Sequence, residues 1–149
     1  MFLHEKTVEI MLKILEAEEN GDNAYPLGIS KEVGSPYSYI SKVLSEFEEN
    51  ALIESEFKGR IRVVRFTEDG RKIAEMLREL KKELGKDFIS RKKLSILRKV
   101  VDEAEESEDR FKVLAPVRAE LEVLKKEAKD EETLRMVEEL SKRVDGLLS

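Results

Sequence analysis

The stretch from residue 35 to residue 53 reads SPYSYISKVLSEFEENALI, and it decides how the first half of the chain folds. Its inward-facing apolar residues recur at spacings of three and four, which predicts a helix with one buried face: Ile40, Val43, Leu44 and Phe47. Ser35 is expected to cap this helix and Pro36 to take its first position, because a serine oxygen accepts free N–H groups and proline's fixed φ suits a helix start. We therefore expect a helix over residues 36–50.

The opposite face of this helix is small, polar or aromatic in a chain that otherwise covers its helices with Glu and Lys. Its outward residues are Tyr37, Ser38, Ser41, Lys42 and Ser45. Small hydroxyl side chains let a helix approach a DNA groove closely and can donate or accept hydrogen bonds at base edges. The alternative to DNA recognition is a solvent-exposed face that happens to lack charge.

The sequence on either side predicts four further elements. Apolar periodicity indicates helices over residues 7–19 and 26–33. The β-branched and aromatic runs 53–57 and 61–66, separated by Lys-Gly-Arg, indicate a hairpin. Thr67 is expected to cap a following helix whose first turn is acidic.

The segments 35–44, 47–53, 60–62 and 66–71, taken in this order, resemble the winged helix-turn-helix domain, particularly that of MarR-like transcription regulators of bacteria and archaea. In that family they correspond to a recognition helix, a closing Gly-Leu-Ile, a basic wing and a Leu-Thr-x-x-Gly-Arg motif. The resemblance covers residues 3–84, somewhat over half the chain. Here Ala51 replaces the usual glycine and Phe66 the usual leucine, and alanine is strained if the turn requires a positive φ.

The resemblance implies a transcription regulator that reads double-stranded DNA with the recognition helix 36–50 and a basic wing 57–62. The recognition helix would lie in the major groove, and the wing would contact phosphates or the adjacent minor groove. The expected DNA-binding residues are Ser35, Tyr37, Ser38, Ser41, Lys42, Lys58, Arg60 and Arg62. The family also permits a small-molecule effector, which no motif in this sequence locates.

Residues 85–149 lack convincing strands, and apolar stripes predict helices over about 90–106, 116–129 and 131–148. The middle stripe has a heptad spacing that is typical of coiled coils. The fold class is thus mainly α with a small β-hairpin: a winged helix-turn-helix domain over 1–84 and a helical dimerisation or interaction region over 85–149. We favour a hairpin or coiled-coil-like unit that makes a homodimer, and a self-contained monomeric bundle is the alternative.

Composition limits the chemistry. The 149 residues include 28 Lys+Arg and 33 Asp+Glu, 41% charged in all, with a net charge of -5. There is no Cys, one His, and no phosphate-binding or metalloprotease motif, so we expect no enzyme, no cofactor and no metal site. No run is apolar enough for a membrane helix or signal peptide, which predicts a cytoplasmic protein. The high Lys and Glu content is also typical of thermophile proteins.

Charge distribution argues partly against DNA binding. Residues 1–84 hold 13 Lys+Arg against 17 Asp+Glu, a net of -4. The alternative function is therefore an acidic winged-helix adaptor that mediates protein–protein interaction in replication or transcription machinery. Local charge at the hairpin still favours DNA, because charges act mainly within a Debye length of about 8–10 Å.

Overall fold

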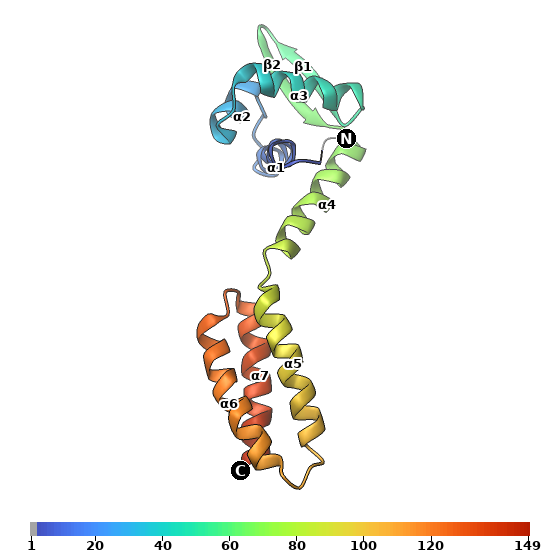
Figure 1. The fold of residues 1–149 in the computed structure, drawn as a ribbon. Helices are drawn as coiled ribbons and strands as arrows, with labels where there is room; N and C mark the ends of the chain where they lie inside the picture. Colours follow the sequence, from blue (N-terminus) through green and yellow to red (C-terminus); the bar gives the residue numbers. More distant parts are fainter. Residues whose placement is uncertain (1–2) are drawn as a thin grey trace. The chain divides into compact units, whose positions relative to one another are not determined.

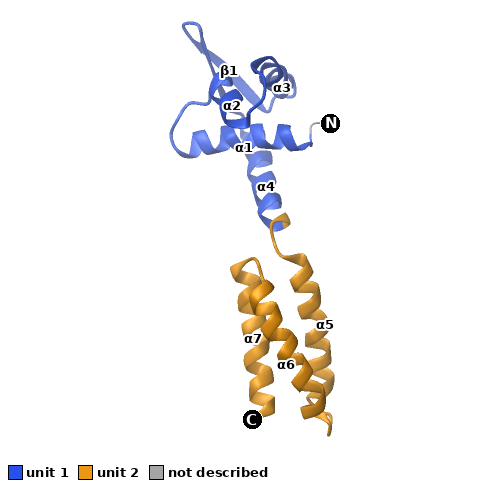
Figure 2. Ribbon diagram, turned by 60° about the vertical axis from the view of Figure 1, so that its left-hand side comes forward, with its two compact units in different colours: residues 1–83 blue, residues 84–149 orange. Residues whose placement is uncertain are grey.

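The computed structural model describes residues 3–149, which divide into two compact units, one ending at Glu83 and one beginning at Leu84 (Figure 2). Each unit has its own buried apolar cluster. Within the described residues, no helix is both long and apolar enough to cross a membrane.

The first unit has the element order of a winged helix-turn-helix domain (Figure 1). Three helices come first, then a two-stranded antiparallel hairpin, then a long helix. They are α1 (Glu5–Glu19), α2 (Pro26–Val33), α3 (Tyr37–Glu49), β1 (Ile53–Lys58), β2 (Ile61–Phe66) and α4 (Glu68–Leu84). The fold class expected from the sequence is confirmed, and the boundaries of α2 and β2 agree with the expected ranges.

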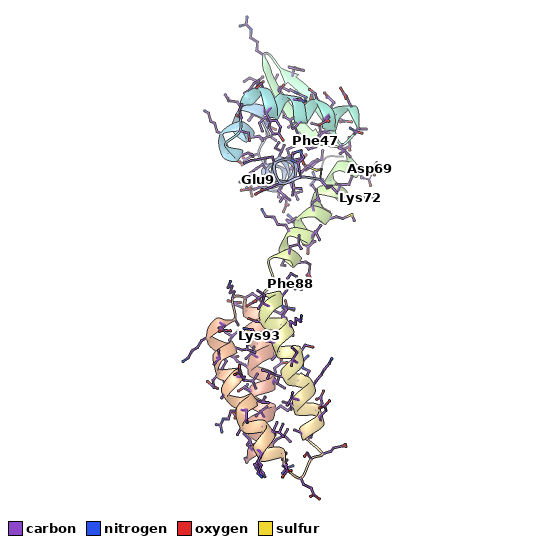
Figure 3. All side chains as sticks on the ribbon, viewed as in Figure 1. Glu9, Phe47, Asp69, Lys72, Phe88 and Lys93 are labelled. Atoms are coloured by element: carbon purple, nitrogen blue, oxygen red, sulfur yellow. The ribbon has the colours of Figure 1, made fainter. Side chains whose placement is uncertain are left out.

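The core of this unit is built from the apolar faces that the periodicity predicted. Phe47 of α3 is fully buried near its centre (Figure 3), and α1, α2, both strands and α4 close around it. The buried set includes Ile10, Met11, Ile14, Leu15, Ile29, Val33, Ile40, Val43, Leu44, Leu52, Ile53, Val64, Phe66 and Ala74. On α4 only Gly70 and Ala74 are buried, whereas Met76, Leu80 and Leu84 are exposed.

The hairpin is fixed at its base and free at its tip. Its register pairs Ile53 with Phe66 at the base and Lys58 with Ile61 at the tip, where Gly59 adopts a φ of 67°. The N–H of Val64 donates to the carbonyl of Ala24 at 3.0 Å, so β2 is also held by the loop that follows α1. The strands 53–58 and 61–66 with their turn are called the wing below.

A tight junction joins α3, β1 and α4. Ala51 takes a φ of 57°, in the left-handed region that favours glycine. Thr67 holds the junction: its hydroxyl donates to the carbonyl of Ala51 at 2.7 Å and its N–H to that of Leu52 at 3.0 Å. Its oxygen accepts the N–H of Gly70 at 3.1 Å, so the expected cap of α4 is confirmed. The Thr-x-x-Gly spacing is thus what lets α4 lie directly against the Leu52 backbone.

The expected start of α3 is wrong by one residue. Pro36 is its N-cap, without a side-chain hydrogen bond, and the helix begins at Tyr37. Ser35 does not cap, because it belongs to the turn that ends α2: its N–H donates to the carbonyl of Ser30 and its carbonyl accepts the Ser30 hydroxyl at 2.6 Å. Gly34, with a φ of 70°, makes this turn possible.

The second unit is a three-helix bundle of α5 (Phe88–Ala104), α6 (Arg110–Glu127) and α7 (Glu131–Leu148). The three apolar stripes bury one another: Leu94, Val101 and Ala104, then Leu114, Val117, Leu121 and Leu124, then Val137, Leu140 and Val144. Within one chain the packing is therefore that of the self-contained bundle, the alternative that the sequence left open. Packing between chains stays a prediction.

The expected start of α6 near Pro116 is wrong, because the helix begins at Arg110 and carries Pro116 inside it. Proline there removes only the hydrogen bond to the carbonyl of Lys112. Both residues are exposed, so water can satisfy that carbonyl.

Two aspartates cap the bundle reciprocally. Asp87 is the N-cap of α5, and its carboxylate accepts the N–H of Ser90 in that helix. It also accepts the N–H of Lys129, which lies in the loop between α6 and α7. The Asp130 carboxylate accepts the N–H groups of Thr133 and Asp87, both at 2.7 Å. These bonds, the one from Thr133 first, lower the pKa of Asp130 to about 2.

Candidate nucleic-acid interface

A groove of about 770 Å³ opens between α2, the first turns of α3 and the wing. Its walls combine aromatic, aliphatic and cationic side chains from all three elements. The lining residues are Tyr25, Pro26, Leu27, Gly28, Lys31, Tyr37, Ser41, Phe57, Arg60, Ile61 and Arg62. None of them carries a carboxylate, in a unit where acids outnumber bases.

Four of the eight residues expected to bind DNA line this groove: Tyr37, Ser41, Arg60 and Arg62. The other four do not line it. Ser38 and Lys42 are exposed on α3, Lys58 is exposed at the tip of the wing, and Ser35 is half-buried in the turn before α3.

The face of α3 is free of acid over its first turns. No Asp or Glu occurs from residue 33 to residue 45, and the acids of α3 lie in its last turn. Of these, Glu48 is engaged by the wing, as described below. A polyanion that approaches the first half of α3 therefore meets hydroxyls and Lys42 before it meets any carboxylate of this helix.

Ion pairing separates the cations of this face from most others in the first unit. Seven of the 13 Lys and Arg side chains form ion pairs with described carboxylates. Lys31, Lys42, Lys58 and Arg60 form none with any residue in the described range 3–149. Their charge is thus not neutralised inside the protein, and local positive potential accumulates on this face although the unit is acidic.

Arg62 differs from the other cations, because it anchors the wing to α3. Its side chain is only 15% exposed, its Nε donates to Ser55 Oγ at 2.8 Å, and its Nη2 lies 3.4 Å from Glu48 Oε2. The N–H of Ser55 donates to the other oxygen of Glu48 at 3.0 Å. Arg62 therefore lines the groove while two of its five N–H donors are used within the fold.

Sequence reasoning missed five lining residues that have large or charged side chains: Tyr25, Leu27, Lys31, Phe57 and Ile61. Residues 26–33 were predicted to form a helix from their buried apolar residues alone. Leu27 and Lys31 lie on the outer face of this helix, and nothing in the sequence marked them as part of a site. Phe57 and Ile61 did carry one, because large apolar residues beside a hairpin turn have no core to enter.

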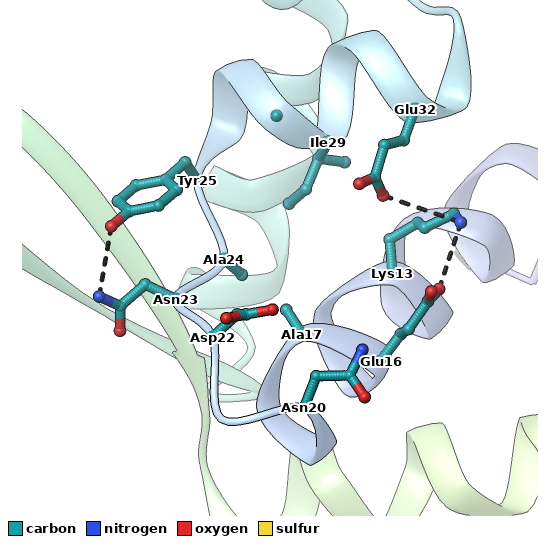
Figure 4. Close-up of a pocket in the computed structure, with 11 residues that line it drawn as sticks. Lys13, Glu16, Ala17, Asn20, Asp22, Asn23, Ala24, Tyr25, Ile29 and Glu32 are labelled. Atoms are coloured by element: carbon teal, nitrogen blue, oxygen red, sulfur yellow. Dashed lines mark hydrogen bonds and ion pairs between the residues drawn. The ribbon is translucent and has the colours of Figure 1, made fainter.

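A second, smaller pocket of about 200 Å³ lies between α1, the loop after it and α2 (Figure 4). Lys13 bridges Glu16 at 3.2 Å and Glu32 at 3.7 Å, and the hydrogen bond to Glu16 is the main reason that the pKa of Lys13 is raised. Asn23 Nδ2 donates to the Tyr25 hydroxyl at 3.3 Å. Lys13, Glu16 and Glu32 of this pocket thus pair with one another and join α1 to α2. Residues 3–149 contain no cluster of His, Asp or Glu that could hold a metal ion.

The chain matches no model of a protein family. It is 32% identical, over 80 residues, to an uncharacterized protein of Archaeoglobus fulgidus. The aligned residues cover 54% of this chain and 84% of that protein. Among solved structures it is similar to AF1382 from Archaeoglobus fulgidus, with 31% identity and a TM-score of 0.55 over 57% of this chain and 94% of that one.

Two further structures are similar over 80% of this chain, at lower identity. They are a mutant of Lactococcus lactis ZitR, with 16% identity over 73% of its chain and a TM-score of 0.47, and the MarR family transcriptional regulator SPO1453 of Silicibacter pomeroyi, with 18% identity over 74% of its chain and a TM-score of 0.45. By its identity to the Archaeoglobus fulgidus relative, most of whose length it covers, the chain belongs to the same family as that protein.

Proposed function

We propose that this protein binds double-stranded DNA through its winged-helix unit and acts as a transcription regulator. One observation carries the proposal: Lys31 and Arg60, which form no ion pair with any residue of the described range 3–149, line a groove whose lining has no carboxylate. Lys42 on α3 and Lys58 at the tip of the wing are exposed and form none within that range either. Unpaired cations on one face bind phosphates by releasing condensed counterions.

We infer the parts of the interface from where these residues lie. The first turns of α3 present Tyr37, Ser38, Ser41 and Lys42 to the major groove, where hydroxyls and a lysine can reach base edges and phosphates. Lys58 and Arg60 reach phosphates or the adjacent minor groove from the tip of the wing. Arg62 sets the angle of the wing through Glu48 and Ser55, so its contribution to binding is mainly one of position.

A titration of full-length protein into labelled duplex at two salt concentrations tests the proposal. Arg60→Ala should weaken binding and lower the slope of log K against log salt by about 1 per protomer. Arg65→Ala is the matched control: Arg65 lies on β2 of the same hairpin, pairs with Glu56 at 3.7 Å and does not line the groove. Equal affinity and slope for the Arg60 variant and the wild type would refute the role of the wing.

We further propose that the protein is a homodimer that uses its C-terminal helices. Support comes from large apolar side chains that the bundle leaves exposed, among them Ile89 at 73% and Ile96 at 55% on α5. Light scattering should give about twice the chain mass of 17.2 kDa. The double variant Ile89→Glu, Ile96→Glu should give the mass of one chain, and a wild-type mass of one chain would contradict dimerisation.

A protein-binding adaptor is the second candidate, favoured by the apolar share of the groove lining. Leu27, Phe57 and Ile61 are each more than half exposed there. This candidate predicts no duplex binding by the wild type even at roughly 50 mM salt, where phosphate contacts are strongest. The titration above therefore separates the two functions.

A further inference from the structure

The tip of the wing carries two large apolar side chains that the core does not use. Phe57 is 67% exposed and Ile61 is 56% exposed, and neither belongs to the buried cluster of the first unit. They stand on either side of the turn formed by Lys58, Gly59 and Arg60. Stability does not explain this arrangement, because a hairpin tip gains nothing from apolar surface left in water.

The turn between these two side chains carries only positive charge, and the nearest acid along the chain, Glu56, pairs with Arg65 at 3.7 Å. From residue 57 to residue 67 the chain has no Asp or Glu, and Lys58 and Arg60 lie between Phe57 and Ile61 without an ion-pair partner among the described residues. An apolar tip with two unpaired cations in its turn is complementary to a partner with an anionic exterior and an apolar interior. Duplex DNA has both, with its phosphates outside and its stacked bases inside.

The tip is also held out from the body of the unit. The groove separates it from α2 and α3, and the hairpin extends beyond these helices (Figure 1). At its base the wing is fixed by Arg62, Ser55 and Glu48. A fixed base lets the tip enter a partner without a change in its own fold, so little ordering is needed on binding.

We propose that the wing inserts Phe57, with Ile61 beside it, between two base pairs from the minor-groove side and thereby bends the duplex. This rests on the proposed function, namely that the chain binds duplex DNA. Apolar wedges of this kind partly unstack a base step and kink DNA by roughly 20–90°. Pyrimidine–purine steps unstack most easily, so the wing selects sequence there without reading a base edge.

The test uses the full chain and a duplex of about 30 base pairs, which the chain selects from a random-sequence pool, with a donor and an acceptor dye at its two ends. Binding of the wild type should shorten the end-to-end distance, as expected for a bend of at least about 20°. The variant Phe57→Ala, Ile61→Ala should bind with an unchanged salt slope and without the bend. Phe57→Leu should keep part of the bend, because leucine is still an apolar wedge.

Met76→Ala is the matched control, since Met76 is 70% exposed on α4 of the same unit, and it should bend DNA like the wild type. Circular dichroism checks that each variant is folded. A wild type that binds without bending, or a double alanine variant that bends fully, would overturn the wedge and leave DNA binding intact. Failure of the wild type to select or bind any duplex would overturn the proposed function itself, and the wedge with it.

Discussion

Replacing Gly70 with alanine should destabilise the first unit, although the same change stabilises most helices. A Cβ at residue 70 would lie 1.8 Å from the carbonyl oxygen of Leu52 and 2.7 Å from its carbonyl carbon. Cβ atoms essentially never lie closer than 3.0 Å to such a neighbour, so α4 and the Leu52 backbone would have to separate by about 1.2 Å.

The cost follows from what that separation breaks. The N–H of Thr67 donates to the Leu52 carbonyl at 3.0 Å, a hydrogen bond that contributes about 1 kcal/mol, whereas the single proton of its hydroxyl goes mainly to the nearer Ala51 carbonyl at 2.7 Å. Overpacking adds about 1–3 kcal/mol of strain. The higher helix propensity of alanine offsets about 1 kcal/mol of this loss in stability. The expected net loss in the free energy of unfolding is therefore about 1–3 kcal/mol.

Urea titration followed by tyrosine fluorescence measures this loss specifically, because all three tyrosines lie in the first unit. The matched control is Gly28→Ala in α2, where an added Cβ meets nothing within 4 Å. That variant should gain about 0.5–1 kcal/mol. A Gly70→Ala variant within about 0.5 kcal/mol of the wild type would refute the account of the junction.

Three further substitutions test other parts of the structure. Ala51→Gly should stabilise the first unit by about 0.5–1 kcal/mol in the same titration, because a φ of 57° strains alanine more than glycine gains in unfolded-state freedom; an unchanged midpoint would contradict this. Arg62→Met should speed amide hydrogen exchange at Ser55, whose N–H belongs to the Arg62 network, whereas Arg65→Met should not; equal rates in both variants would show that Arg62 does not anchor the wing. Asp130 has a pKa of about 2 in the fold against 3.8 ordinarily, so its stabilising effect is complete above about pH 4 and is lost as the pH falls toward 2. The difference in melting temperature between wild type and Asp130→Asn, followed by circular dichroism, should shrink over that range, and a difference independent of pH would argue against the cap.

Local signals in the sequence predicted most of the first unit. Spacings of three and four located α1 and α3 because each helix buries one face, and Lys-Gly-Arg located the hairpin because its turn needs a positive φ at Gly59. The prediction that Ser35 caps α3 was wrong for a physical reason. Serine caps a helix only when its hydroxyl is near the free N–H groups, and here Ser35 is part of the turn that ends α2. The start of α6 was misplaced because proline is tolerated where the carbonyl it leaves free is exposed to water.

The candidate site was less predictable, because it depends on how separate elements meet. Tyr37 and Ser41 followed from the face of one helix, and Arg60 from the turn of the hairpin. That Lys31 of α2 lies on the same groove could not be read from any one element. The sequence also does not show that Arg62 is held within the fold whereas Arg60 is not. The reason is that Arg62 pairs with Glu48, which lies 14 positions away in the chain.

The central claim is that unpaired cations beside the groove bind phosphates. The direct measurement is the salt dependence of duplex binding for two charge-matched variants of the full chain: Lys58→Ala, Arg60→Ala at the tip of the wing, and Lys81→Ala, Lys82→Ala on α4. Both variants remove two cations that make no ion pair within residues 3–149. The slope of log K against log salt should fall by about 2 per protomer for the wing variant and stay at the wild-type value for the α4 variant. Equal slopes for the two variants would contradict the assignment of this face to DNA.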